Sequence, residues 1–369
     1  MNYCFDYVRP KHVAEFKNKA AKDHYKPSAL SVHTYANALL VPGGMGPCSG
    51  IYVKGTVIPY SSFEFSVQSN CDIETSLERD EEVFYLGMFD ACWGHCLGDN
   101  LRHIWPVVRG TLALNVKFVY MTSAPEIKLP TNFIAMLKAI GIDLTAAEKI
   151  VRPMRFSKLH MADPSYWLSP EFKGRYYSKE FEETIDAIRS KFLGAYGERL
   201  NRVYFSRAGW KTAKPDIGER LLELAFRNKG YEIVHPEELT IEGLINMLAN
   251  CREFVATDGS CAHNAIFSPR GAKLVVLRKA SYVNDVQMVF NQMRDLDVTI
   301  VDAYRDDFLA YPSQPWLGPF YLCVNKYLAR FLDCETAYDI VGYFAYFCSF
   351  VRMRTRICIS SVKHGLLKW

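Results

Sequence analysis

The chain has 369 residues, of which 49% are hydrophobic, 14% aromatic and 23% charged, and its formal net charge is +4. This length is too great for one small core and predicts two domains, and the composition suits globular packing. The net charge is small, and the sequence lacks runs of Lys and Arg interleaved with aromatic residues. Both observations argue against a nucleic-acid-binding protein.

The first half of the chain predicts α/β structure after an irregular start. Residues 1–30 are charged and weakly patterned, so we expect an N-terminal arm there. The elements expected after it are short strands and turns over 40–67, strands over 83–89, 116–121 and near 149–156, and helices over 132–140 and 178–196. A first domain over residues 31–195 follows from this order.

A polar stripe is predicted directly after the strand at 83–89. Its members stand at helical spacings i, i+4, i+7 and i+8: His95, Asp99, Arg102 and His103. One continuous helix would place these four side chains on one face and turn the apolar residues between them to a core. Because ligands of α/β sheets bind where strands end, we interpret the stripe as a catalytic or ligand site, with a solvated helix face as the alternative.

The second half alternates strands and helices more clearly. The expected elements are strands over 202–206, 231–235, 253–257 and 273–277, and helices over 218–228, 240–250 and 260–267, the second of these capped by Thr240. This alternation predicts βαβ units, a parallel sheet and right-handed crossovers. We place this second, Rossmann-like domain at residues 196–310.

The loop between the strand at 253–257 and the helix at 260–267 is a candidate anion site. Gly259 allows close approach to the backbone, and Asp258 or Ser260 can cap the helix. The free N–H groups of that helix would favour a phosphate, to which His263 and Asn264 could donate. Asp258 would repel a diphosphate unless it caps the helix or binds a hydroxyl. The alternative is an ordinary capped helix.

Further candidate residues follow neighbouring strands of the same predicted sheet. Arg207 comes directly after the strand at 202–206, and its planar guanidinium suits phosphate oxygens, although such an arginine can equally be a surface residue. Glu237 and Glu238 follow the strand at 231–235, and either could bind a ribose or cap a helix. Because GxGxxG, Walker A and GxSxG motifs are absent from the sequence, dinucleotide, P-loop and serine hydrolase sites are disfavoured.

The sequence has few patterns that would indicate a membrane segment, disulfide bonds or a metal site. No apolar signal region or stretch of roughly 20 apolar residues is present. The apolar residues 341–351 precede three arginines, which predicts a core-packed helix or, alternatively, peripheral membrane contact through 341–356. The eleven cysteines lack a CxxC pair, so we expect reduced thiols and a cytoplasmic protein, at most peripheral at the inner face of the membrane. No metal site is expected, since no second ligand pair accompanies Cys92, His95 and Cys96.

Three blocks in shared order resemble glycosyltransferase family 61. They are residues 94–99 with Trp105, residues 203–207, and the run from Gly230 to Gly271. The resemblance implies a GT-B-like α/β fold, in which two Rossmann-like domains face each other across a cleft. It makes 31–195 the acceptor side and 196–310 the nucleotide-sugar side, with a C-terminal helical segment over 311–369 packing back on the first domain.

The same resemblance implies inverting transfer of a hexosyl or pentosyl group from a nucleotide donor, usually UDP-linked, without a metal or other cofactor. His95 and Asp99 match the first block, Arg207 the second, and Gly259 and Asn264 the donor loop. The chain departs from many members in that loop, where it has Asp-Gly-Ser in place of His-Gly-Ala.

Inverting transfer needs a base for the acceptor hydroxyl and a positive group at the leaving diphosphate. We expect Asp99 to be the base, with His95 as its rival or orienting partner, and Arg102 and His103 to be structural or at the rim. Arg207 and the loop with His263 would hold the diphosphate.

The expected acceptor is an oligosaccharide, a polysaccharide or a lipid-linked glycan, as in a bacterial-type capsule or surface glycan. Two alternatives stay open. One is a non-catalytic nucleotide- or glycan-binding module on the same fold. The other is a metal-assisted phosphohydrolase built on His95, Asp99 and His103.

Overall fold

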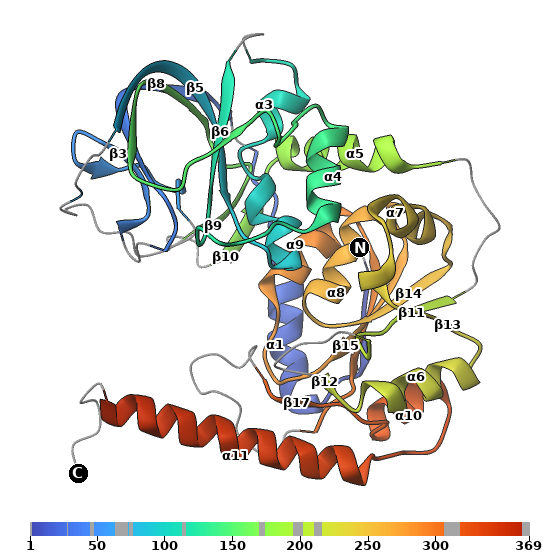
Figure 1. Cartoon of the computed structure of the whole chain (residues 1–369). Coiled ribbons are helices and arrows are strands. Elements are labelled where there is room, and N and C mark those ends of the chain that lie inside the picture. Colours follow the sequence, from blue (N-terminus) through green and yellow to red (C-terminus); the bar gives the residue numbers. More distant parts are fainter. Residues whose placement is uncertain are drawn as a thin grey trace. The chain divides into compact units, whose positions relative to one another are not determined.

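The computed structural model describes residues 2–27, 29–44, 48–62, 73, 77–112, 116–169, 174–194, 202–209, 216–305 and 318–363. Two compact units make up the chain. The seven-stranded unit comprises residues 23–195 and 240–246, and the six-stranded unit comprises residues 1–22, 196–239 and 247–369. Both combine helices with a sheet, so the predicted α/β class is confirmed (Figure 1). The predicted boundaries at 195/196 and 310/311 lie outside the described residues.

The seven-stranded unit is built on a mixed sheet with the order β4-β3-β2-β8-β5-β6-β7. Its strands are β2 (Val32–Val41), β3 (Gly50–Val53), β4 (Thr56–Val57), β5 (Leu77–Phe89), β6 (Lys117–Thr122), β7 (Glu148–Lys149) and β8 (Met154–Ala162). The expected strand at 83–89 is the buried end of β5, whose earlier residues alternate in exposure. The strand expected near 149–156 lies later, as β8, which pairs with β2 and β5.

Short helices and a hairpin complete this unit. They are α2 (Trp93–Cys96), η2 (Asp99–Leu101), α3 (Trp105–Val108), α4 (Thr131–Ala139), α5 (Lys179–Phe192), and the antiparallel strands β9 (Tyr166–Ser169) and β10 (Gly174–Tyr177). The helices expected over 132–140 and 178–196 are α4 and α5. The boundary between the units falls within α7 (Ile241–Asn250), whose Gly243 N–H donates to the Thr240 hydroxyl as the predicted cap requires.

The six-stranded unit has a parallel sheet with the order β1-β16-β15-β14-β11-β13. Its strands are β1 (Asn2–Tyr7), β11 (Arg202–Phe205), β13 (Glu232–Val234), β14 (Glu253–Thr257), β15 (Lys273–Arg278) and β16 (Asp297–Asp302). Its helices are α1 (Pro10–Ala20), α6 (Glu219–Asn228), η3 (Pro236–Glu238), α8 (Ser260–His263), η4 (Asn264–Phe267), α9 (Asp285–Met293), α10 (Lys326–Leu332) and α11 (Ile340–Lys363). The expected strands of the second half are therefore present and parallel.

The order of these strands creates a topological switch point. In the sheet, β11 lies between β13, the next of its strands in the chain, and β14, which continues to β15 and β16. The chain therefore leaves β11 toward one edge of the sheet and later returns to build toward the other. In parallel α/β sheets, ligands bind outside the carboxyl ends of the strands at such a point. The residues after β11 and β14 thus occupy the favoured position for a ligand.

The prediction of an N-terminal arm is wrong. β1 pairs in parallel with β16 at one edge of the six-stranded sheet, and α1 buries Phe16. The Arg9 N–H donates to Asp302 over 2.9 Å, and Lys19 on α1 forms an ion pair with Asp285 on α9. Local charge hid these elements, since their partners stand almost 300 positions later in the chain.

The C-terminal segment, which the sequence predicts to pack on the first domain, makes its described contacts within the six-stranded unit. β12 (Asp216–Ile217) and β17 (Phe320–Tyr321) form a small parallel pair, and α11 lies on it through the rings of Tyr321, Tyr343 and Tyr346. These contacts place α11 in the six-stranded unit. In the described part of the chain, no helix combines the length and apolar character needed to cross a membrane.

The cysteines depart from the expectation of reduced thiols at one position. Cys48 is disulfide-bonded, whereas the eight free cysteines of the described residues are Cys4, Cys92, Cys96, Cys251, Cys261, Cys323, Cys334 and Cys348. Disulfides persist mainly in oxidising compartments. The argument for a reducing compartment from cysteine usage therefore fails at Cys48.

Candidate functional site

The predicted polar stripe lies on short helical turns and not on one helix. α2 makes a single turn, and the chain then bends at Gly98 (φ −131°, ψ −87°) before η2 begins at Asp99. A Cβ atom on Gly98 would lie 2.9 Å from the ring of Tyr166, so no larger residue fits there. Because the helix is interrupted, the four stripe residues separate into two pairs with different surroundings.

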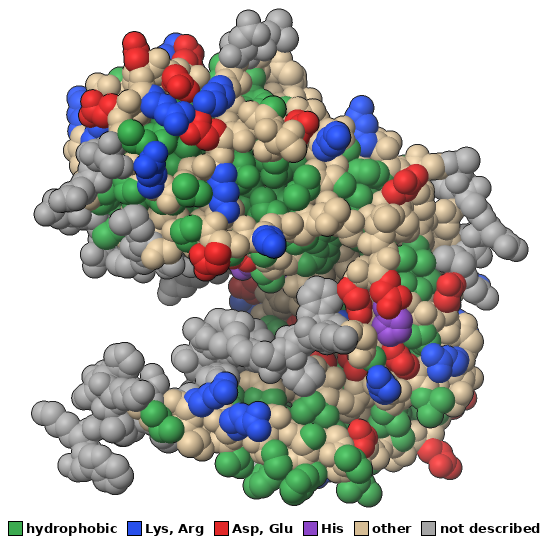
Figure 2. All heavy atoms as spheres, in the orientation of Figure 1, with side chains coloured by type: hydrophobic (Ala, Val, Ile, Leu, Met, Phe, Trp, Pro, Cys, Tyr) green, Lys and Arg blue, Asp and Glu red, His purple; other side chains and the backbone are tan. Residues whose placement is uncertain are grey.

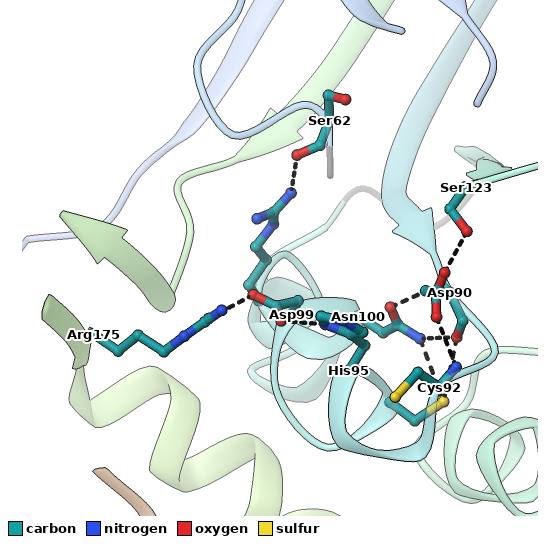
Figure 3. Close-up of polar contacts among 10 residues, drawn as sticks. Ser62, Asp90, Cys92, His95, Asp99, Asn100, Ser123 and Arg175 are labelled. Atoms are coloured by element: carbon teal, nitrogen blue, oxygen red, sulfur yellow. Dashed lines mark hydrogen bonds and ion pairs between the residues drawn. The ribbon is translucent and has the colours of Figure 1, made fainter. Parts of the chain in front are cut away.

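The first pair, His95 and Asp99, forms a charged network with Arg175 of β10 (Figure 3). His95 Nδ1 lies 2.7 Å from one carboxylate oxygen of Asp99, and Arg175 Nη1 lies 2.9 Å from the other. Burial by itself would raise the pKa of Asp99, but the Arg175 guanidinium and the His95 hydrogen bond outweigh it and hold that pKa well below its usual range. Asp99 is therefore a permanently charged acceptor.

This network favours His95 over Asp99 as a general base. A carboxylate whose pKa is strongly lowered is a weak proton acceptor, and both Asp99 oxygens already accept hydrogen bonds. A charged acceptor at Nδ1 keeps the proton on that nitrogen, so the Nε2 lone pair is the basic position of the ring. The side chain of His95 is 38% exposed, against 10% for Asp99, so His95 is also the residue that a substrate can reach.

Arg175 is a functional candidate that sequence reasoning missed. It is the one charged residue of β10, and it stacks over the ring of Tyr166 at 5.4 Å. A buried arginine needs a carboxylate partner, and Asp99 supplies it from a position 76 residues earlier. An arginine between Gly174 and two tyrosines was the available signal, but no local pattern connects it with Asp99.

The second pair, Arg102 and His103, is buried and structural. Arg102 donates to the backbone oxygens of Tyr60 and Ser62, the latter drawn in Figure 3, and His103 Nδ1 lies 2.8 Å from the Ala162 oxygen. Burial lowers the pKa of His103 to about 3, so this ring stays neutral. The rim alternative is therefore wrong for both residues, and His103 is not placed to join His95 at a metal.

Asp90, Cys92 and His95 are the candidate metal ligands among the described residues. One ligand atom from each lies within 4.8 Å of the others. An oxygen, a sulfur and a nitrogen donor would suit zinc with solvent as the fourth ligand. The Asp90 carboxylate, however, already accepts hydrogen bonds from the Cys92 N–H and the Ser123 hydroxyl. The sequence alone groups Cys96, and not Asp90, with Cys92 and His95. In the structure Cys96 is buried, and burial raises the pKa of its thiol.

A second cluster lies at the switch point of the six-stranded sheet. Arg207 follows β11, Gly259 follows β14 and Lys279 follows β15, so all three stand at the carboxyl ends of adjacent strands. Arg207 Nη1 lies 2.9 Å and Lys279 Nζ 3.3 Å from the same oxygen of Asp216. Two cations therefore share one carboxylate at the position where the topology favours a ligand.

Lys279 is the second residue that sequence reasoning missed. Only 7% of it is exposed, and its Nζ lies 3.9 Å from where a Cβ of Gly259 would be. Buried lysines are rare unless they are paired or serve a ligand. The available signal was the basic pair Arg278 and Lys279 at the end of an otherwise apolar strand.

The structure revises the roles predicted within the loop after β14. Gly259 is the N-cap of α8, with φ +110° that favours glycine, and no side chain caps the helix, so the capping predicted from Asp258 or Ser260 is wrong. Asp258 is buried, which raises its pKa, and accepts a hydrogen bond from Asn284. Asn264 donates to the Cys261 oxygen within the loop.

The anion-binding role moves accordingly from the helix to the cations. α8 is a single turn, so its dipole is too short to hold an anion as predicted. His263 is buried with Nε2 3.3 Å from Asn284, and Ser260 is half-buried at the start of the turn. Arg207 and Lys279 are therefore the stronger candidates for a diphosphate.

Comparison with known families covers the His95 network and most of the second cluster. A model of glycosyltransferase family 61 matches residues 93–275, which run from α2 through β10, β11 and the loop after β14. The chain belongs to glycosyltransferase family 61. This membership supports glycosyltransferase activity in general. Lys279 lies just beyond the matched residues.

More distant relatives are phosphoglycerol transferases. Phosphoglycerol transferase I of Salmonella arizonae is 25% identical over 161 residues, which are 42% of this chain and 19% of that protein. The protein of the same name from Salmonella paratyphi B is 24% identical over the same length. The chain thus spans about a fifth of the length of these curated relatives.

Glu238, a predicted ribose ligand, is exposed at the end of η3. Its neighbour Glu237 turns toward the preceding loop, with Oε1 2.8 Å from where a Cβ of Gly209 would be and 3.9 Å from His235 Nδ1. Glu237 also adds to the negative potential at Arg207. Of the two acidic candidates from the sequence, Glu237 is therefore the one that stands near the switch point.

Glu219 makes the stability of the protein depend on pH. Burial and the Asp216 charge raise its pKa from 4.5 to about 7, while it accepts hydrogen bonds from the Tyr204 hydroxyl and the Arg207 N–H. Between pH 4.5 and about pH 7, Glu219 is protonated in the folded state and ionised in the unfolded state. The free energy of unfolding should therefore fall by up to about 3 kcal/mol as pH rises from 4.5 to 7, and then level off.

Urea unfolding of the wild type and of Glu219→Gln at pH 5, 6, 7 and 8 measures this dependence. The difference between the two proteins isolates Glu219, and it should grow in favour of the variant as pH rises to 7. Glu232→Gln, at an exposed glutamate of β13, serves as the matched control and should run parallel to the wild type. A constant difference between wild type and Glu219→Gln across this range contradicts a protonated Glu219.

Proposed function

We propose that this protein transfers a sugar from a nucleotide donor, UDP-linked, to a hydroxyl of a glycan acceptor, with inversion at the anomeric carbon. The observation that carries the proposal is the pair of cations, Arg207 and Lys279, at the switch point of a parallel sheet. Such points bind nucleotides in other α/β proteins. Family 61 membership supports glycosyl transfer as the reaction.

On the donor side, the proposal gives the diphosphate to Arg207 and Lys279. A departing diphosphate gains negative charge as its bond to the sugar breaks, and fixed cations stabilise that charge without reorganisation. Asp216 holds both cations in place. Two fixed cations can supply the charge that a divalent ion supplies elsewhere, so we propose a metal-independent reaction with no cofactor besides the donor.

On the acceptor side, the proposal makes His95 the base. Nε2 takes the proton of the acceptor hydroxyl as its oxygen attacks C1 of the donor sugar. The bond between C1 and the diphosphate oxygen breaks, and its electron pair leaves with the diphosphate. Asp99 holds the ring through Nδ1 and stabilises the imidazolium that forms, while Arg175 keeps Asp99 charged.

A GT-B arrangement would join the two clusters, since each unit carries one half of the required chemistry. We propose that the seven-stranded unit receives the acceptor and the six-stranded unit the donor. The acceptor class is an oligosaccharide, a polysaccharide or a lipid-linked glycan, as in capsule or surface-glycan synthesis. The disulfide at Cys48 favours an oxidising compartment over the cytoplasm that the sequence predicts.

A panel of nucleotide sugars tests the function. Thermal shift and donor hydrolysis are measured with UDP-, GDP- and CMP-linked sugars, with and without EDTA. We expect a UDP-sugar to raise the melting temperature and to be hydrolysed slowly, and EDTA to leave both unchanged. Cys92→Ser, which removes one candidate metal ligand, should behave as the wild type.

Each contrary result points to a different class of protein. Binding of UDP-sugars without hydrolysis, and without transfer to any glycan in an acceptor panel, identifies a non-catalytic module. Loss of hydrolysis with EDTA and in Cys92→Ser identifies a metal enzyme at Asp90, Cys92 and His95. The phosphohydrolase predicted from the sequence requires His103 beside His95 and Asp99. In the structure His103 is buried and hydrogen-bonded to the Ala162 oxygen.

A further inference from the structure

The C-terminal helix α11 has two apolar sides. One side is buried and carries Gly342, Tyr346 and Met353, of which Tyr346 stacks on Tyr321. The other carries Ile340, Phe344 and Val351, which are 82%, 67% and 46% exposed. At 100° per residue these two stripes lie on nearly opposite sides of the helix. Within the part of the chain that the structure describes, only the first of these sides is packed.

Exposed apolar surface is concentrated on this helix. Six of the ten exposed large hydrophobic side chains in the described part of the chain belong to α11: Ile340, Val341, Phe344, Phe347, Val351 and Ile359. Figure 2 shows hydrophobic side chains gathered along the surface where α11 lies in Figure 1. Single exposed hydrophobic residues are ordinary, but a continuous row of them indicates an interaction surface.

The charges of α11 indicate the chemistry of the surface that it meets. From Ile340 to Lys363 the helix contains no Asp or Glu, whereas Arg352, Arg354 and Arg356 come directly after Val351. Figure 2 shows basic side chains on the same stretch of the surface. A surface that matches this helix has an apolar layer covered by negatively charged groups. The hydrocarbon and anionic head groups of a bilayer provide both.

Other occupants fit the helix less well. Two copies packed along this row would bring their arginines together without an acidic residue on either helix to neutralise them. A glycan acceptor offers hydroxyl groups but little apolar surface for Ile340 or Phe344. Crossing the bilayer is also excluded for α11, since no described helix is apolar enough to do so.

We propose that α11 lies in the plane of an anionic membrane surface, with Ile340, Phe344 and Val351 in the head-group and acyl boundary. Arg352 and Arg354, which flank the exposed row, then reach lipid phosphates, while the Tyr346 side of the helix keeps its packing on β12 and β17. At about 1.5 Å per residue the 24-residue helix is about 36 Å long, enough to bind many lipids at once. This binding does not depend on the proposed sugar transfer.

Co-sedimentation of the full chain with large vesicles tests the proposal. One set contains phosphatidylcholine alone, and the other contains equal parts of phosphatidylcholine and phosphatidylglycerol. We expect binding to the anionic vesicles about 25-fold tighter than to the neutral ones, because Arg352 and Arg354 each contribute about 5-fold. Phe344→Asp should weaken binding to the anionic vesicles about 10-fold or more. Arg352→Glu with Arg354→Glu should remove most of the preference for anionic lipid.

Leu224→Asp is the matched control, since Leu224 is 52% exposed on α6 of the same unit and should leave vesicle binding unchanged. Thermal unfolding verifies that each variant is folded. Donor hydrolysis by Phe344→Asp should equal that of the wild type, which separates this proposal from the proposed function.

Two outcomes overturn the membrane assignment. The first is equal binding of wild type and Phe344→Asp to anionic vesicles. The second is a dimer of the lipid-free wild type, seen by light scattering, that Phe344→Asp converts to a monomer, since the row would then be an interface between copies.

Discussion

Replacing His95 with Ala should lower sugar transfer by about 10²–10⁴-fold, the usual contribution of a positioned acid or base. Donor affinity should stay within about 2-fold of the wild type, since the base acts on the acceptor and Asp99 and Arg175 can still pair. Steady-state transfer assays and calorimetry with UDP measure the two quantities. Added imidazole should restore part of the lost rate, because it can occupy the space of the missing ring and accept the same proton.

Asp99→Asn distinguishes the two candidates for the base. An asparagine loses the negative charge that holds the proton on Nδ1 of His95 and stabilises the imidazolium. We therefore expect Asp99→Asn to lower transfer as well, but without rescue by imidazole. His160→Gln is the matched control, since His160 lies in the same unit on β8 and pairs with Glu82. Full activity of His95→Ala, or a rate that imidazole does not change, would remove His95 from the proton transfer and return that role to Asp99.

Replacing Arg207 or Lys279 with Ala should weaken UDP binding by about 10- to 100-fold each, since a hydrogen bond to a charged group contributes about 1.5–3 kcal/mol. Calorimetry with UDP measures this loss. Uridine lacks the diphosphate, so its affinity should change little in either variant. A loss of affinity that is confined to UDP assigns the cations to the phosphates and not to the general shape of the site.

Arg220→Ala is the matched control, because Arg220 is an exposed arginine on α6 near the same sheet edge and should bind UDP as the wild type does. Asp216→Asn gives a further test. Its carboxylate holds Arg207 and Lys279 in place, so its loss should weaken UDP binding, but by less than the loss of either cation. Equal UDP affinity of wild type, Arg207→Ala and Lys279→Ala would place the diphosphate elsewhere.

Much of the six-stranded unit was predictable because its signals are local. Strands such as β14 and β15 are short apolar runs, buried along most of their length, and glycines or capping residues mark the ends of the helices between them. The same alternation predicts a parallel sheet and so places Arg207 and Gly259 at one edge. His95 and Asp99 were likewise within reach of the sequence, since four residues separate them and they do meet at 2.7 Å.

The sequence by itself determined the α/β class, the parallel order of its second half, and the pairing of His95 with Asp99, all of which depend on neighbours within one or two elements. Only the tertiary structure decided what completes each cluster. Arg175 reaches Asp99 across 76 positions, Lys279 reaches Asp216 across 63, and β1 pairs with a strand almost 300 positions away. Such contacts follow from how strands are ordered in a sheet, which no local pattern of apolar and polar residues encodes. The low pKa of Asp99, on which the proposal of His95 as the base depends, arises in part from one of these distant contacts.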